Sequence, residues 1–156
     1  MEFRRIIEKR KSVRSFSGKP VARDTLDYIL SAGSLAPTSR NRRPCTFHLI
    51  EDKETLWKLS CAKQAGAAFA ADAAAAVVVA ADSEKADTWI EDSSIALTYM
   101  MLAAEEQELG CCWVQLHLRF SADGRDAEAN AREILGLPQN FRIVGFLALG
   151  YRKEEE

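Results

Sequence analysis

Three cations and one hydroxyl lie within five consecutive positions near the start of the chain: Arg10, Lys11, Ser12 and Arg14, with Val13 among them. A phosphate monoester is close to a dianion at neutral pH, and guanidinium forks with a hydroxyl are suited to hold it. In an extended segment, Arg10, Ser12 and Arg14 would point to one side and could converge on one ligand. The alternative is a solvated basic helix end that complements the helix dipole.

A polar loop at residues 36–44 is the second candidate. It offers hydroxyls, an amide and free backbone N–H groups, which can bind the edge of a polar heterocycle. The relevant residues are Pro37, Thr38, Ser39 and Asn41. An ordinary connecting loop is the alternative. Nucleic-acid contacts by Arg40, Arg42 and Arg43 are disfavoured, because no aromatic residue is interleaved and the chain is acidic overall.

The third candidate, residues 109–117, runs from a helix end directly into a strand, where a ligand could lie against backbone amides. Its vicinal Cys111 and Cys112 are expected to be reduced and buried, with a strained disulfide or a redox role as the alternative. His117 is a possible proton donor or a structural histidine. With 2 histidines and no cysteine pair at metal spacing, no zinc site is expected. No dinucleotide fingerprint, P-loop, HExxH motif or nucleophile elbow occurs.

Bulk composition is that of a globular chain: 156 residues, 47% hydrophobic, 28% charged, with a formal net charge of −2. We expect one domain over residues 1–156. The charge gives no reason to expect a nucleic-acid or membrane partner. The alanine-rich run at 65–81 is interrupted by Asp72 and is too weakly apolar for a membrane span. Residues 1–14 do not resemble a secretory leader, so a reducing cytoplasm is the expected location.

The elements that must position these residues follow from periodicity and from turn residues. Helices are predicted at residues 2–10, 22–35, 55–62 continuing through 65–71, 86–109 and 127–135. Strands are predicted at 46–51, 74–81, 111–118 and 143–149. Helices followed by strands that alternate with helices indicate a three-layer α/β or α+β domain.

Helical spacing also predicts which side chains face the core. In the first helix these are Phe3, Ile6 and Ile7. In the long helix at 86–109 they are Trp89, Ile90, Ala96, Leu97, Met100 and Ala103. Gly110 is placed to act as the C-cap of that helix. The long helix has more apolar residues than one sheet face needs, which suggests that part of it meets a second subunit.

Taken in order, these segments resemble the FMN-dependent nitroreductase family. The matching pieces are RKSVRSF at 10–16, LAPTSRNRRP at 35–44, the long helix ending at Gly110, CWVQ at 112–115, ILGLP at 134–138 and LALGY at 147–151. The resemblance spans nearly the whole chain. It implies an α+β three-layer sandwich with a central, mostly antiparallel sheet flanked by helices. It also implies a homodimer that binds FMN at the subunit interface.

The resemblance assigns roles at matching positions. For the FMN phosphate and ribityl chain these are Arg10, Ser12 and the adjacent Lys11, with Arg152 and Lys153 as a second cation site. Arg14 matches a cation near the flavin pyrimidine. Pro37, Thr38 and Ser39 match a loop supplied by the second subunit, and Asn41 an amide at the ring edge. Gln115 and Leu116 match the backbone beside N5 and O4, where an N–H donor would support hydride arrival. Arg43 and Cys45 depart from a frequent glutamine and tryptophan.

The implied function is that of an oxidoreductase. It would pass electrons from NADH or NADPH through FMN to a small electron-poor acceptor of nitroaromatic or quinone type, by a ping-pong mechanism. FMN carries this chemistry, so no catalytic side chain is expected. Two alternatives stay open. One is different flavin chemistry on the same fold, such as reductive dehalogenation or oxidative flavin breakdown. The other is a non-catalytic flavin-storage or redox-sensing module.

Overall fold

The structure is a computed structural model that describes residues 1–154. Its helices are α1 (Phe3–Lys9), α2 (Arg23–Ser34), α3 (Lys53–Ser60), α4 (Trp89–Glu106) and α5 (Ala127–Leu135). Two short 3-10 turns are η1 (Ser39–Asn41) and η2 (Ala68–Asp72). The strands are β1 (Cys45–Ile50), β2 (Ala75–Asp82), β3 (Gly110–Gln115) and β4 (Phe141–Gly150).

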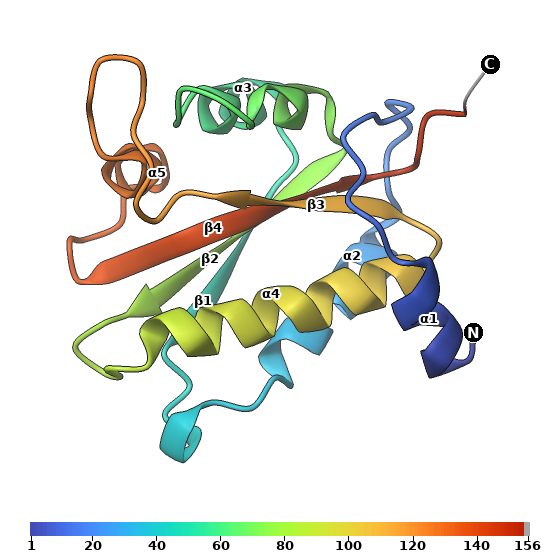
Figure 1. Cartoon of the computed structure of the whole chain (residues 1–156), viewed down its shortest axis with the longest axis horizontal. Coiled ribbons are helices and arrows are strands. Elements are labelled where there is room, and N and C mark those ends of the chain that lie inside the picture. Colours follow the sequence, from blue (N-terminus) through green and yellow to red (C-terminus); the bar gives the residue numbers. More distant parts are fainter. Residues whose placement is uncertain (155–156) are drawn as a thin grey trace.

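One sheet with the strand order β1-β2-β4-β3 forms the middle layer, and every adjacent pair is antiparallel. Figure 1 shows α3 and α5 on one face of this sheet, and α2 and α4 on the other with α1 beside them. The predicted α+β three-layer sandwich with a central antiparallel sheet is confirmed.

Strand β2 lies in the interior of the sheet and is buried on both faces. Val78 packs with Leu56 of α3, whereas Val77 and Val79 belong to the cluster with Met100 of α4. Burial of a valine side chain contributes roughly 1.5–3 kcal/mol, so these side chains anchor both outer layers. The strand predicted from this valine run is confirmed. Its consecutive valines point alternately to opposite faces of the sheet, as strand geometry requires.

The N-terminal segment lies along the edge of β3. The Val13 N–H donates to the Cys111 carbonyl over 2.9 Å, and the Ser17 N–H donates to Tyr151 over 2.9 Å. A Cβ on Gly110 would lie 2.7 Å from Val13 Cγ1, so only glycine fits at this approach. Sheet pairing therefore fixes the path of the segment that carries the basic motif.

The predicted C-cap role of Gly110 is wrong. Helix α4 ends at Glu106, and Glu108 takes the left-handed conformation with φ 61°. Gly110 instead begins β3, opposite Gly150 of β4. A glycine after a helix can satisfy either a left-handed turn or a close approach, and here the close approach to Val13 applies.

The segments predicted at residues 65–71 and 111–118 also differ from the structure. Residues 65–71 are not a helix: Gly66 turns the chain at φ 79°, and only the 3-10 turn η2 follows. Strand β3 stops at Gln115 instead of reaching Leu118. The N–H groups of Leu116 and His117 both donate to the Val144 carbonyl, over 2.8 and 3.0 Å. This shared acceptor ends the regular ladder.

Some apolar side chains predicted to face the core lie at the surface of the single chain. In α1 only Ile6 is buried, while Phe3 is 64% exposed and Ile7 is also exposed. Ile90 is exposed on α4, whose other predicted core residues are buried. Despite this apolar surface, the described residues 1–154 contain no helix long and apolar enough to cross a membrane.

Replacing Gly145 by alanine tests the packing between β3 and β4. The added Cβ would lie 2.3 Å from the Val114 carbonyl oxygen, which the ladder prevents from moving. We expect Gly145→Ala to lower the free energy of unfolding by about 3 kcal/mol in a denaturant titration. Gly150→Ala is the control, because its nearest neighbour, Ala74 N, is 3.2 Å away and a smaller loss is expected. Equal losses would contradict this account of the strand spacing.

Candidate functional site

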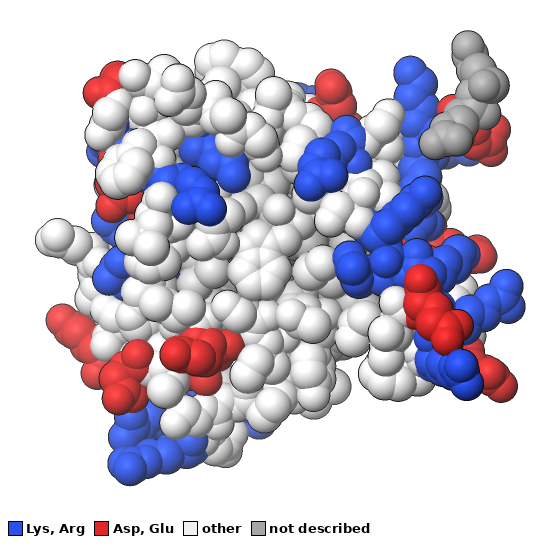
Figure 2. All heavy atoms as spheres, in the orientation of Figure 1, with Lys and Arg blue, Asp and Glu red and all other residues white. Residues whose placement is uncertain are grey.

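A cationic cavity brings together two segments from opposite ends of the sequence. Its volume is about 290 Å³, and Glu154 is the one carboxylate among its lining residues. The lining residues that were predicted for the site are Lys11, Ser12, Arg14, Arg152 and Lys153. Figure 2 shows Lys and Arg side chains gathered on this side of the molecule, with an uncharged surface extending away from them.

Arg10 was also predicted for the site, but it is not among the residues that line this cavity. Helix α1 ends at Lys9, and Arg10 is its extended C-cap. Burial raises the pKa of Cys111 to about 12, while the nearby positive charges of Arg10 and Arg152 act in the opposite direction. The charges of both arginines therefore act on the same thiol. Cys111 stays protonated at neutral pH, and it and Cys112 are buried free thiols, as predicted.

A buried carboxylate holds Arg152 in place. Its Nη2 donates to Glu105, which is 1% exposed, and its Nη1 donates to the Glu108 carbonyl over 3.3 Å. The other oxygen of Glu105 accepts no hydrogen bond within residues 1–154, and Lys9 Nζ lies 3.9 Å from it. The guanidinium of Arg152 is thus fixed in orientation, with part of its donor capacity already used.

The polar loop is held by local hydrogen bonds. The Ser39 N–H donates to Asp92 over 3.1 Å, and the Arg43 N–H donates to Thr38 Oγ1 over 3.0 Å. The Asn41 side-chain oxygen accepts from Arg43 Nε over 3.0 Å, which leaves its amide N–H₂ to a ligand. Pro37 is exposed beside these residues.

Backbone strain marks the same loop. Arg40, Asn41 and Arg43 have φ values of 52°, 53° and 50°, in the left-handed region that arginine seldom adopts. Figure 1 shows this loop, with η1, well away from the N-terminal segment that lines the cationic cavity. Within one chain the structure therefore does not bring the two predicted parts of the site together.

The third predicted segment has most of its polar groups paired. Gln115 Oε1 accepts from Trp113 Nε1 over 3.0 Å, and Gln115 Nε2 donates to the His117 carbonyl over 3.2 Å. The Leu116 N–H, expected to be a donor toward a flavin, is already bonded to Val144. By contrast, the N–H of Leu118, at φ 59°, forms no hydrogen bond within residues 1–154.

Sequence reasoning missed a buried network centred on Glu128, which is 2% exposed. Glu128 accepts from Arg142 over 2.9 and 3.0 Å and from the Ile143 N–H over 3.0 Å. His117 Nδ1 lies 2.7 Å from the same carboxylate. Burial alone would raise the pKa of Glu128, but the bonds from Arg142, His117 and Ile143 outweigh it and lower that pKa.

The Glu128 network also fixes the surroundings of His117. Arg142 stacks over the Trp89 ring at 4.3 Å, and His117 meets the same ring edge-on at 5.3 Å between centroids. This packing agrees with the structural alternative for His117. The available sequence signal was the position of Glu128 on α5, next to the fully buried Ala127 and three residues before the buried Ala131.

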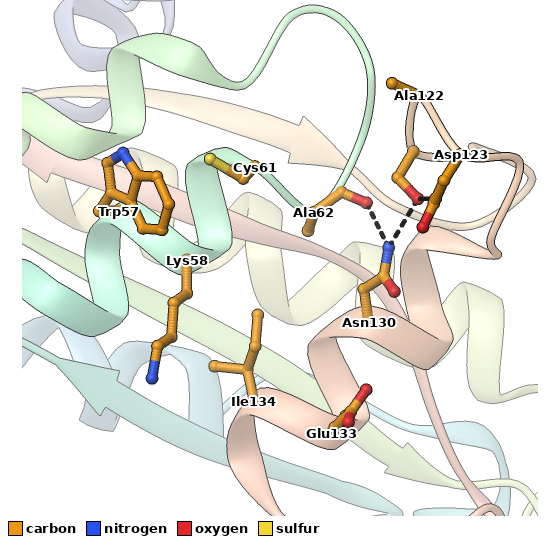
Figure 3. A pocket seen from close by; sticks show the side chains of 10 residues that line it. Trp57, Lys58, Cys61, Ala62, Ala122, Asp123, Asn130, Glu133 and Ile134 are labelled. Atoms are coloured by element: carbon orange, nitrogen blue, oxygen red, sulfur yellow. Dashed lines mark hydrogen bonds between the residues drawn. The ribbon is translucent and has the colours of Figure 1, made fainter.

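A groove larger than the cationic cavity contains none of the predicted site residues. It measures about 650 Å³ and lies between α3 and α5, with Trp57 and Ile134 among its lining residues. Figure 3 shows Asn130 reaching from α5 across the groove, where it donates to the Ala62 carbonyl over 2.9 Å and to Ser121 Oγ over 3.1 Å. Those bonds tie the loop before α5 to the end of α3.

Comparison with known proteins gives a consistent result. The model of the nitroreductase family matches two overlapping stretches, residues 7–70 and 58–151. A relative from Archaeoglobus fulgidus, provisionally named NADH dehydrogenase/NAD(P)H nitroreductase, is 32% identical over 156 residues, covering 97% of this chain and 86% of the relative.

Solved structures agree with the sequence comparison. An FMN-dependent nitroreductase from Clostridium difficile superposes with a TM-score of 0.93 at 39% identity, covering 97% of this chain and 88% of that one. A nitroreductase-type protein from Desulfovibrio desulfuricans, solved in complex with FMN, has a TM-score of 0.81 over 99% of this chain and 88% of that one. At 22% identity, the second likeness concerns the fold alone.

Replacing Glu128 by glutamine tests the buried network. We expect Glu128→Gln to lower the free energy of unfolding by about 3 kcal/mol at neutral pH, because Arg142 loses its buried anionic partner. A carboxyl whose folded pKa is lowered stabilises the protein above its unfolded pKa, and this contribution is lost as pH falls through the folded pKa. The variant and the parent should therefore approach each other in acid.

Glu133→Gln is the matched control on the same helix, since Glu133 is exposed and pairs with Arg125 at the surface. Its cost should be within about 0.5 kcal/mol. Thermal or urea unfolding at several pH values measures both. A Glu128→Gln loss that stayed constant from neutral to acid pH would contradict the role given to its charge.

Proposed function

The chain belongs to the nitroreductase family, and from that premise we propose that it is an FMN-dependent oxidoreductase passing electrons from NADH or NADPH to a small electron-poor acceptor. The cationic cavity carries this proposal, because it is formed by the residues that match the family's phosphate-binding motif. When bound, FMN supplies a two-electron carrier that accepts hydride from the nicotinamide and gives it to a nitroaromatic or quinone in a second half-reaction.

The residues of the cavity suit a phosphate dianion. Lys11, Arg152 and Lys153 supply positive charge, and Ser12 supplies a hydroxyl. Charge-assisted bonds of this kind are roughly twice as strong as neutral ones. Glu105 orients Arg152 before any ligand arrives, which lowers the entropy lost on binding. Arg10, which directly precedes Lys11, adds positive charge to this region.

Arg14 and the end of β3 are assigned to the rest of the flavin. Arg14 lines the cationic cavity and a second cavity beside Gly18, and we assign its guanidinium to the flavin pyrimidine, where its charge would stabilise the reduced ring. Gln115 and Leu116 lead the chain to the ring. Because the Leu116 N–H is bonded to Val144, we assign the donor toward N5 to the free N–H of Leu118. No side chain acts as a general acid or base in this scheme.

A homodimer is part of the proposal. Pro37, Thr38, Ser39 and Asn41 lie far from the cationic cavity of their own chain, so this loop contributes only if a second copy brings it there. Exposed apolar side chains support such a partner. A groove of about 410 Å³ between α1, α2 and α4 has Phe3, Tyr28 and Tyr99 among its lining residues. A second copy would cover this surface.

The first test is an absorbance spectrum of the protein after addition of FMN and desalting. We expect retained flavin bands that bleach when NADH or NADPH is added without oxygen, since the nicotinamide reduces the bound flavin. Retained bands that do not bleach would point to the storage or sensing alternative. For turnover, parallel double-reciprocal plots for donor and acceptor are expected, and intersecting lines would contradict the ping-pong scheme.

Replacing Arg14 by glutamine tests the role of the cationic cavity in FMN binding. Loss of one charge-assisted contact should weaken FMN binding by about tenfold or more. Quenching of flavin fluorescence during titration of the protein measures this affinity. Arg4→Gln is the control, because Arg4 is an exposed cation that pairs with Glu8 on α1. Equal affinity of both variants and the parent would remove Arg14 from the site.

Tyr99→Glu tests the dimer. A charge placed on the apolar surface of α4 should prevent association, because a buried unpaired carboxylate is costly. We expect a monomer by size-exclusion chromatography with light scattering, together with reduced FMN retention. Trp57→Ser is the control, since Trp57 is also an exposed aromatic residue but lies on α3, on the other side of the sheet. A parent protein that is monomeric and still holds FMN would overturn the shared site.

A further inference from the structure

The turn after β3 exposes two large apolar side chains around a cation. Leu118 is 71% exposed and Phe120 is 57% exposed, with the exposed Arg119 between them. This turn is not a loose loop. Leu118 has φ 59°, and the Ala127 N–H donates to the Arg119 carbonyl over 2.9 Å, which ties the turn to the start of α5. Strained, well-anchored backbone that presents apolar groups to solvent is typical of binding surfaces.

A second cation lies beside this turn. The Gln64 N–H donates to the Phe120 carbonyl over 2.9 Å, which places the half-buried Lys63 next to residues 119–120. Burial lowers the pKa of Lys63, and the positive charge of Arg119 lowers it further. The two cations are thus close enough to repel each other.

These two cations have no acidic partner among the described residues. Within residues 1–154 neither Lys63 nor Arg119 forms an ion pair, and the one side-chain hydrogen bond of Arg119 is from Nη1 to the Leu118 carbonyl at 3.1 Å. The nearby Arg125, in contrast, pairs with Glu133. Figure 2 shows Lys and Arg side chains beside an uncharged surface over the end of β3. Neighbouring cations without an acidic partner favour an anionic ligand.

We propose that Lys63, Arg119, Leu118 and Phe120 bind the electron acceptor, and that the acceptor is a planar molecule carrying a carboxylate or a similar anionic group. Its ring would pack on Leu118 and Phe120, and its anion would lie between the cations, where a guanidinium can hold a carboxylate with two bonds. That the ligand of this site is the electron acceptor rests on the proposed function, because the N–H of Leu118 is the one assigned to the flavin ring. The anion preference rests on the four side chains alone.

The test compares a charged ligand with a neutral one of the same shape, 4-nitrobenzoate and 4-nitrobenzamide. Titration calorimetry on the protein as purified, with no nicotinamide present, gives both dissociation constants without turnover. We expect the benzoate to bind about tenfold more tightly, and Lys63→Gln or Arg119→Gln to remove most of that preference. The preference should also decrease as salt is raised from low to high concentration. Arg119→Lys should restore part of it.

Arg125→Gln is the matched control, because it removes an equal charge from the same loop but from a residue already paired with Glu133. Circular dichroism verifies that each variant is folded. Equal affinity for the two ligands in the parent, or equal weakening of both ligands in the variants, would overturn the proposal. The 2′-phosphate of NADPH has similar chemistry. Variants that changed the preference for NADPH over NADH but left benzoate binding intact would therefore also overturn it.

The outcomes separate this inference from the proposed function. A benzoate preference that depends on Lys63 and Arg119, in a protein whose flavin is not reduced by either nicotinamide, would leave the site standing and overturn the oxidoreductase. Reduction of both ligands with equal kcat/KM, unchanged in the variants, would leave the oxidoreductase standing and overturn the anion-binding site.

Discussion

The pairing of the N-terminal segment with the edge of β3 is the constraint on which the site depends. The bond from Val13 to Cys111, and the absence of a side chain at Gly110, let this segment lie directly against the sheet. The Lys153 N–H donates to the Ser15 carbonyl over 3.2 Å, so the chain after β4 is held by the same segment. Cations from both ends of the sequence are thereby brought together, although their mutual repulsion opposes this. Backbone hydrogen bonds and the buried core beneath them hold the charges where electrostatics alone would not.

Two buried carboxylates complete the arrangement, one at each end of the sheet. Glu105 holds Arg152 beside the cationic cavity, and Glu128 holds Arg142 beside the end of β3. A buried acid is costly unless it is paired and hydrogen-bonded, and each of these has an arginine partner. Both positions act on the site without lying in it. One orients a cation of the cationic cavity, and the other fixes the strand ends from which the turn at residues 118–120 leaves.

Local pattern was sufficient for much of the fold, and contacts distant in sequence account for the rest. Gly136 and Pro138 were sufficient to predict the end of α5, where Gly136 takes the left-handed conformation, and the valine run was sufficient to predict β2. The order of the short motifs along the chain was enough to identify the two segments that form the cationic cavity. The role of Gly110 was not predictable, because its close neighbour Val13 is far away in sequence. Alanine propensity likewise favoured a helix around Gly66, where the chain must instead turn to enter β2. The partners of Glu128 come from separate elements, so only the tertiary structure reveals them.

The Val144 carbonyl accepts hydrogen bonds from two consecutive residues, and this has a consequence for where the chain can gain or lose residues. Up to Gln115, each residue of β3 is in register with β4, and one inserted residue would exchange the inward and outward sides of everything before it. Leu116 and His117 share that one carbonyl, and beyond them the chain is no longer paired in register with β4. Insertions and deletions between this point and α5 would leave the sheet and the cationic cavity unaltered. The length of the turn that contains residues 118–120 is therefore free to differ between relatives, whereas the strands beside the cationic cavity must keep their register.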